Sequence, residues 1–115
     1  MGFCFGGGLT WLMSVRNPNV KATAAFYGAR PPIEEVPNMQ AAALGIYASL
    51  DTGINSTKAE LEAALKANNK THKMVTYDGA NHAFFNDTGT RYHQASATSA
   101  WTETLAWFRT HLKGQ

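Results

Sequence analysis

The hydrophobic positions of the chain fall into three short stretches that predict the strands of a buried sheet. They occupy residues 20–27, 43–50 and 72–77. The second stretch is almost continuously apolar, which is typical of a parallel strand covered on both faces. Turn residues close each stretch, namely Gly28, Asp51-Thr-Gly53 and Asp78-Gly79. The pattern therefore indicates three strands of one sheet.

Helical spacing of apolar residues predicts three helices around these strands. The first begins at Gly6 or Gly7 and continues to about residue 15, before an Asn-Pro pair. The second begins at Thr57 and Glu60, which have the spacing of a capping box, and it ends near residue 68. The third covers residues 95–112. Its predicted apolar stripe consists of Trp101, Leu105, Phe108 and Leu112.

The order of these elements predicts the fold class. Helix, strand, strand, helix, strand and helix follow one another, which indicates an α/β fold with three mainly parallel strands and flanking helices. Residues 30–37 contain three prolines and are interpreted as a surface loop. The sequence shows no internal repeat, low-complexity tract or linker. We therefore expect a single domain over residues 1–115.

Composition and charge narrow the classes of partner. The chain has 44% hydrophobic residues, 16% charged residues and a formal net charge of +2. Its Lys and Arg residues are scattered, which disfavours nucleic-acid binding. No apolar run is long enough to cross a bilayer, and the apolar opening lacks the basic region of a signal peptide. Together with the single cysteine, these features predict a cytoplasmic protein that binds neither nucleic acid nor membrane.

The glycine-rich start of the chain holds this cysteine. The sequence Gly2-Phe-Cys4-Phe-Gly-Gly-Gly8 precedes an apolar run, a pattern typical of a nucleophile elbow. Glycines two positions before and two after the cysteine, Gly2 and Gly6, remove Cβ atoms where a strand and a helix nearly touch. The N-terminus of the following helix favours the thiolate of Cys4. A small buried cysteine beside a glycine-rich loop is the alternative that these eight residues leave open.

Three residues with catalytic side chains lie at the elbow and at predicted strand ends. Cys4 stands at the elbow, Asp51 follows the second strand and His82 follows the third. In an open parallel sheet, such positions meet at one edge. An imidazole can take the thiol proton, and a carboxylate can orient the imidazole. The backbone N–H of Phe5 can donate to an oxyanion. The sequence thus predicts a Cys-His-Asp triad.

The acid and the histidine also have structural explanations that the sequence leaves open. Asp51 can cap the helix that follows it, and His82 alone can be a hydrogen-bonded loop histidine. Asp78 and Asp87 are rival acids, although a turn accounts for each of them. The other histidines have no comparable context, and their spacing gives no set of metal ligands beside His82. We therefore expect no metal site.

Four segments of the chain resemble the dienelactone hydrolase (carboxymethylenebutenolidase) family. They are Gly2-Phe-Cys4-Phe-Gly-Gly-Gly8, Phe26-Tyr27-Gly28, Ile46-Tyr-Ala-Ser-Leu-Asp51 and Tyr77-Asp-Gly-Ala-Asn-His82-Ala-Phe84. The resemblance covers essentially all of this chain and the second half of the family's α/β-hydrolase domain. It implies hydrolysis of a small ester or lactone through an acyl-thiol intermediate, without a metal or cofactor. By the same resemblance, Cys4 is the nucleophile, His82 the base and Asp51 the orienting acid.

Two departures from the family qualify these expectations. The family's early strands and helices are absent, so we expect a partial α/β-hydrolase fold. The family's substrate-binding arginine after the histidine motif is replaced by Asn86, which leaves Asn86 and Phe84 as the candidate substrate contacts. An unpaired sheet edge and an uncovered apolar face predict a homo-oligomer or a complex with a complementary N-terminal half. A catalytically silent fragment that acts as such a self-associating or partner-binding module is the alternative function.

Overall fold

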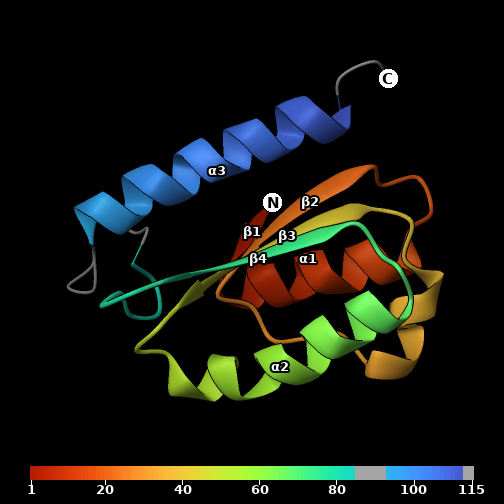
Figure 1. Cartoon of the computed structure of the whole chain (residues 1–115), viewed down its shortest axis with the longest axis horizontal. Coiled ribbons are helices and arrows are strands. Elements are labelled where there is room, and N and C mark those ends of the chain that lie inside the picture. The colour runs from red at the N-terminus through yellow and green to blue at the C-terminus, as the bar shows by residue number, and fades with distance from the viewer. Residues whose placement is uncertain (85–92, 113–115) are drawn as a thin grey trace.

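The computed structural model of the chain describes residues 1–84 and 93–112. In these residues, a single sheet of four parallel strands lies between layers of helices (Figure 1). The elements in chain order are β1 Gly2–Phe3, α1 Phe5–Arg16, β2 Ala22–Phe26, the 3₁₀ helix η1 Ile33–Asn38, β3 Ala42–Ala48, α2 Thr52–Ala67, β4 His72–Tyr77 and α3 Gln94–Leu112. The predicted α/β fold with parallel strands is confirmed, and the three predicted strands correspond to β2, β3 and β4.

The strands pair in their order along the chain, β1-β2-β3-β4, and neighbouring strands run parallel. β1 is a fourth strand that the sequence pattern did not predict, because two residues are too few to show a period. It pairs with the end of β2, where Phe3 lies opposite Phe26. Because the strands are parallel, their carboxyl ends lie side by side, and the candidate residues follow these ends along the chain.

Alternating side chains of the strands build a core on each face of the sheet. On one face, Leu44 of β3 belongs to a cluster with Ala97 of α3. On the other face, Ala43 belongs to a cluster with Trp11 of α1 and Leu61 of α2. Figure 1 shows the same arrangement, with α3 on one side of the sheet and α1 and α2 on the other. Because both faces are covered, β3 is apolar along its whole length, as expected for an interior parallel strand.

Helix α3 packs on the sheet through a different face from the predicted one. Its buried residues are Ser96, Ala97, Ala100 and Thr104. These small side chains let the helix lie close to the strands, and the indole N–H of Trp107 donates to the carbonyl of Ala42 at 3.1 Å. Of the predicted stripe, Phe108 packs against the core, whereas Trp101 and Leu112 are 44% and 42% exposed. The size of the side chains on this helix did not indicate which face is buried.

Two local predictions are corrected by the structure. Helix α2 begins at Thr52, so Thr57 lies inside it and donates its hydroxyl to a carbonyl of the preceding turn at 2.8 Å. The predicted capping box at Thr57 and Glu60 is therefore wrong. Residues 33–38, most of which belong to the predicted surface loop, form η1, and Val36 is fully buried in the core beneath α1 and α2. This segment is a packed connection rather than a surface loop.

Candidate active site

Cys4 lies on the tight turn between β1 and α1 and is partly exposed. Its backbone has a φ of 55° and a ψ of −118°, a conformation that residues with a side chain rarely adopt. The Cys4 N–H donates to the carbonyl of Phe26 at 3.1 Å, and the Cys4 carbonyl accepts from the N–H of Gly8 at 3.2 Å. Strand β2 and the first turn of α1 thus fix this strained residue. The geometry is that of a nucleophile elbow.

Close backbone contacts explain three of the glycines around this turn. A Cβ on Gly2 would overlap the carbonyl oxygen of Gly6. Gly7 and Gly28 lie against each other, and a Cβ on Gly28 would lie only 2.7 Å from the Cα of Gly7. Gly6 has open space at its own Cβ position, so the predicted need for glycine two positions after Cys4 is wrong. The close approach falls one residue later because α1 crosses the end of β2 at Gly7.

Asp51 and His82 meet at the carboxyl ends of β3 and β4. The Nδ1 of His82 lies 2.5 Å from the Oδ2 of Asp51. The other carboxylate oxygen, Oδ1, accepts from the N–H of Ile54 at 3.4 Å and caps α2. The carboxylate of Asp51 therefore contacts both the N-terminus of α2 and the ring of His82. With a carboxylate as its partner, Nδ1 is the donor of this bond, and in a neutral imidazole Nε2 is then the acceptor.

Further hydrogen bonds join the loops that carry these two residues. The N–H of Ser49 donates to the carbonyl of Tyr77 at 3.0 Å, and the N–H of Leu50 donates to that of Ala80 at 2.9 Å. The hydroxyl of Ser49 accepts in turn from the N–H of Gly79 at 2.8 Å. Because the loops after β3 and β4 are connected in this way, the acid and the histidine keep a fixed relative position.

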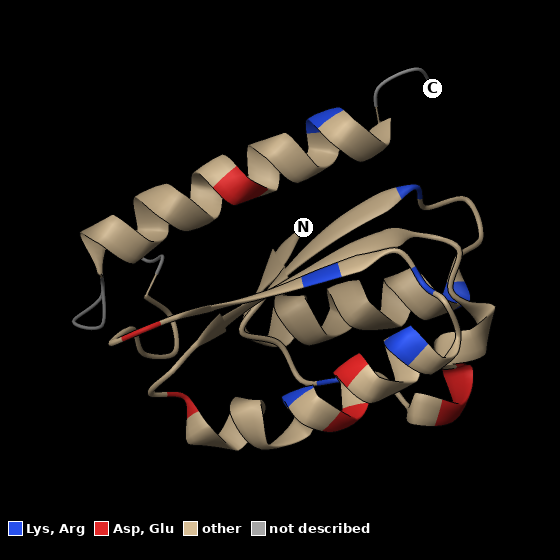
Figure 2. Ribbon diagram, in the orientation of Figure 1, with Lys and Arg blue, Asp and Glu red and all other residues tan. Residues whose placement is uncertain are grey.

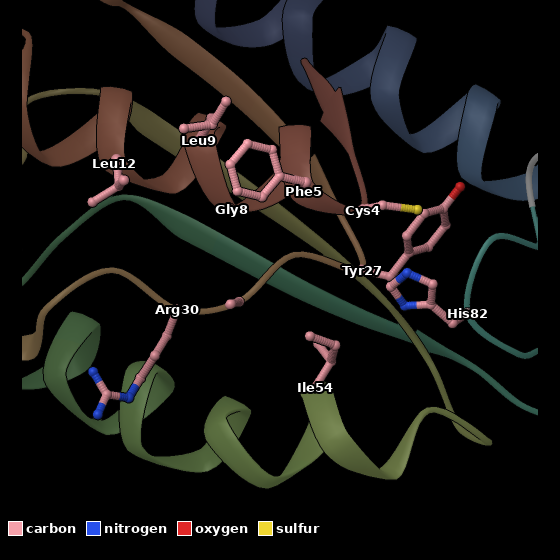
Figure 3. Close-up of a pocket in the computed structure, with 10 residues that line it drawn as sticks. Cys4, Phe5, Gly8, Leu9, Leu12, Tyr27, Arg30, Ile54 and His82 are labelled. Atoms are coloured by element: carbon pink, nitrogen blue, oxygen red, sulfur yellow. The ribbon is translucent and has the colours of Figure 1, made fainter.

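Cys4 and His82 line the same pocket, which has a volume of about 320 Å³. The described residues that line it are Cys4, Phe5, Gly8, Leu9, Leu12, Tyr27, Ala29, Arg30, Ile54 and His82. Figure 3 shows the sulfur of Cys4 directed towards the ring of Tyr27, with the ring of His82 next to Tyr27. Phe5 is the first residue of α1, and N–H groups of a first helical turn have no acceptor within the helix. The pocket thus brings together a thiol, an oriented imidazole and a helix N-terminus.

Tyr27 also belongs to the site, although the sequence predicted no role for it. Its ring lies 4.9 Å from that of His82, measured between centroids, and its side chain is almost fully buried. Its backbone has a φ of 39°, and its N–H donates to the carbonyl of Ile46 at 2.7 Å. The signal in the sequence is the position of Tyr27 immediately before Gly28, at the carboxyl end of a predicted strand. Tyr27 forms one wall against which the imidazole rests.

Of the two candidate substrate contacts, the structure describes Phe84 alone, and Phe84 is not among the residues that line the pocket. Phe84 is completely buried, and its ring packs against Tyr27 at 5.5 Å and against Tyr77 at 5.6 Å. It therefore supports the wall of the site from within the core. Asn86 and the rival acid Asp87 lie outside the described residues.

The other histidines that can be placed lie apart from this pocket. The Nδ1 of His72 is 2.7 Å from the carbonyl of Lys70, at the opposite end of β4 from His82. The Nδ1 of His93 accepts from the N–H of Ser96 at the start of α3. Within residues 1–84 and 93–112, no three His, Cys, Asp or Glu side chains are placed to hold a metal ion. In the same ranges, no helix is both long and apolar enough to cross a membrane.

Solved structures resemble this chain over nearly its whole length. The crystal structure of a Klebsiella pneumoniae protein assigned as a dienelactone hydrolase is 36% identical, with a TM-score of 0.88 over 93% of this chain and 49% of that one. A dienelactone hydrolase-like promiscuous phosphotriesterase, P91, from metagenomic libraries has a TM-score of 0.87 at 18% identity, over 96% of this chain and 50% of that one. At that identity, the likeness to P91 shows the fold alone.

Sequence comparison gives the same relationship. A Salmonella typhi protein assigned as a carboxymethylenebutenolidase is 37% identical over 93% of this chain and 44% of its own length. This chain therefore spans less than half the length of that relative. The family model described as the dienelactone hydrolase family matches residues 1–112. Because that match extends over almost the entire chain, the protein belongs to the dienelactone hydrolase family.

Proposed function

We propose that this chain hydrolyses a small ester or lactone with Cys4 as nucleophile, His82 as base and Asp51 as orienting acid. The observation that carries the proposal is the bond between His82 Nδ1 and Asp51 Oδ2, next to the pocket that Cys4 and His82 share. With Nδ1 bonded to the acid, Nε2 is the nitrogen that can exchange protons with the sulfur. Membership of a hydrolase family supports the same assignment.

In the proposed reaction, Nε2 of His82 takes the thiol proton of Cys4, and the sulfur attacks the carbonyl carbon of the ester. The carbonyl oxygen becomes an oxyanion, to which the N–H of Phe5 donates. The bond to the leaving alcohol then breaks, and His82 returns its proton to that alcohol. Water then gives a proton to His82 as its oxygen attacks the thioester carbon. The carbon–sulfur bond breaks, the carboxylic acid is released, and His82 returns the proton to the sulfur to restore the thiol.

The test is the hydrolysis of p-nitrophenyl acetate by the wild type and by Cys4→Ala. We expect the variant to fall to the buffer rate, because the chain has no second thiol to form the acyl intermediate. Circular dichroism checks that the variant keeps its fold. Cys4→Ser is a second variant, whose hydroxyl is a weaker nucleophile than a thiol at neutral pH and which we expect to be much slower than the wild type. Equal rates for wild type and Cys4→Ala would refute the proposal.

A second candidate function, self-association, is favoured by an apolar surface of α1 that adjoins the pocket. Phe5, Leu9 and Met13 are 82%, 50% and 51% exposed and lie one turn apart along α1. Figure 2 shows α1 without a charged residue until its last turn. Next to this helix, β1 pairs with β2 on one side, and no other strand in the described part of the chain pairs with it. An apolar helix face beside an open strand edge is a typical docking surface for another chain.

We expect the purified chain to form a homodimer that buries roughly 1,000 Å² or more through this surface. Met13→Lys places a charge at the end of the apolar row that lies away from the pocket and should shift the protein towards the monomer. Ala59→Lys adds the same charge at an exposed position of α2 and should leave the dimer intact. Light scattering with sedimentation velocity measures the outcome. A wild type that is a monodisperse monomer with a cooperative thermal transition would contradict the expectation.

A further inference from the structure

The pocket beside Cys4 is built almost entirely from apolar side chains. Leu9 and Leu12 of α1 form one side, and Ile54 of α2 forms the other. Apart from His82, the described lining carries one ionisable side chain with a charge at neutral pH, that of Arg30. The charge of this arginine therefore decides whether the pocket favours an anionic or a neutral group.

Arg30 is already held by partners outside the pocket. Its Nε lies 2.8 Å from Oε1 of Glu60, and its Nη1 donates to the carbonyl of Pro31 at 3.0 Å. In Figure 3, the guanidinium group is directed towards α2, away from the sulfur of Cys4. The pair is partly exposed, with 34% of the Arg30 side chain and 58% of the Glu60 side chain accessible. Glu60 thus opposes the positive charge and also orients the group that carries it.

We propose that the pocket takes a neutral, apolar part of the substrate and that Glu60 determines this specificity by holding the guanidinium group of Arg30 away from Cys4. The inference rests on the proposed function, because it takes Cys4 as the reacting atom. A carboxylate on the substrate would lose its hydration in the pocket without gaining an ion pair, since Arg30 already has one. An alkyl group would instead be buried against Leu9, Leu12 and Ile54. Glu60 acts here through Arg30 and is a positioning residue.

Two thiol reagents of matched size test this proposal without requiring turnover. N-Butylmaleimide and 4-maleimidobutyric acid differ in whether the chain on the ring ends in a methyl or a carboxylate. Each adds the Cys4 sulfur to one carbon of the maleimide double bond, and the other carbon takes a proton. Since Cys4 is the only thiol of the chain, intact-mass spectrometry reports its alkylation directly. Each rate is divided by the rate at which the same reagent alkylates N-acetylcysteine. This correction removes the difference in intrinsic reactivity between the two reagents.

For the wild type, we expect the neutral reagent to react about tenfold faster than the anionic one after this correction. In Glu60→Gln, the released Arg30 should attract the carboxylate and reduce that preference severalfold, and added salt should weaken the change. Glu60→Gln combined with Arg30→Gln should restore the preference for the neutral reagent. Glu62→Gln removes the same charge from α2 without touching Arg30 and should behave as the wild type.

An equal ratio of rates in the wild type and in Glu60→Gln would overturn the proposal, as would the same loss of preference in Glu62→Gln. The result is independent of the test of hydrolysis. If the alkylation rates follow the expected order while p-nitrophenyl acetate is not hydrolysed, the specificity of the pocket stands and the proposed hydrolase function fails. If hydrolysis depends on Cys4 but both reagents react alike in every variant, the proposed hydrolase function stands and the proposed specificity of the pocket fails.

Discussion

Replacing Gly28 with alanine is expected to lower the free energy of unfolding by about 3 kcal/mol. The added Cβ would lie 2.7 Å from the Cα of Gly7 and closer still to the carbonyl carbon of that residue. Both groups belong to the backbone, so the overlap cannot be relieved by rotating a side chain. Relief requires moving α1 away from the end of β2, which opens the core beneath Trp11. Domains of this size are stable by only about 5–15 kcal/mol, so the loss is a large fraction of the total.

Gly6→Ala is the matched control for this change. Gly6 lies in the same glycine run and in the first turn of α1, but its Cβ position is open. Alanine favours the helix over glycine by about 0.5–1 kcal/mol, so this variant should be slightly more stable than the wild type. Urea denaturation followed by circular dichroism measures both variants. Similar midpoints for the two would show that the contact between Gly7 and Gly28 does not limit the approach of α1 to the sheet.

Replacing His82 with alanine is expected to reduce kcat/KM for p-nitrophenyl acetate by about 10²–10⁴-fold. The variant removes the nitrogen that exchanges protons with the sulfur of Cys4 and with the leaving alcohol. Asp51→Asn should also reduce the rate, because an amide cannot stabilise the imidazolium as a carboxylate does. Asparagine is as good a helix cap as aspartate, so the N-terminus of α2 should keep its stability in this second variant.

His72→Ala is the control for the histidine. His72 is the first residue of β4, whereas His82 follows the last, so the two histidines lie at opposite ends of this strand. We expect its kcat/KM to match that of the wild type. Thermal unfolding of each variant separates loss of fold from loss of chemistry. If His72→Ala and His82→Ala lose the same activity, or if neither loses any, His82 is not the base.

The three longer strands could be predicted because each shows its pattern over five or more consecutive residues. Residues 43–50 are apolar almost throughout, and β3 occupies Ala42–Ala48 with both faces covered. Residues 72–77 coincide with β4. The two-residue strand β1 and the 3₁₀ helix η1 are too short to show a period, so their pairing and burial depend on neighbours that are distant in sequence.

The face of α3 was not predictable from its largest apolar residues. Trp101 and Leu112 are exposed, while Ala100 and Thr104 are buried. The face of α3 that packs against the sheet is the one with small side chains, because these side chains fit the space between the helix and the strands. The start of α2 was predicted too late, because Thr57 and Glu60 have the spacing of a capping box, whereas Asp51, which the sequence offered as an alternative cap, caps the helix.

The sequence by itself determined the order of the three α-helices and the three longer strands, the parallel α/β class and three candidate residues. Periodicity and turn residues are local, so they can be read without knowing what packs where. Only the tertiary structure decided that Asp51 serves both α2 and His82, that Tyr27 supports the imidazole, and that Gly7 and Gly28 touch. It also decided which partner Arg30 takes, since Glu60 reaches it from another element. Such contacts join residues far apart in the chain, and no local pattern encodes their distance.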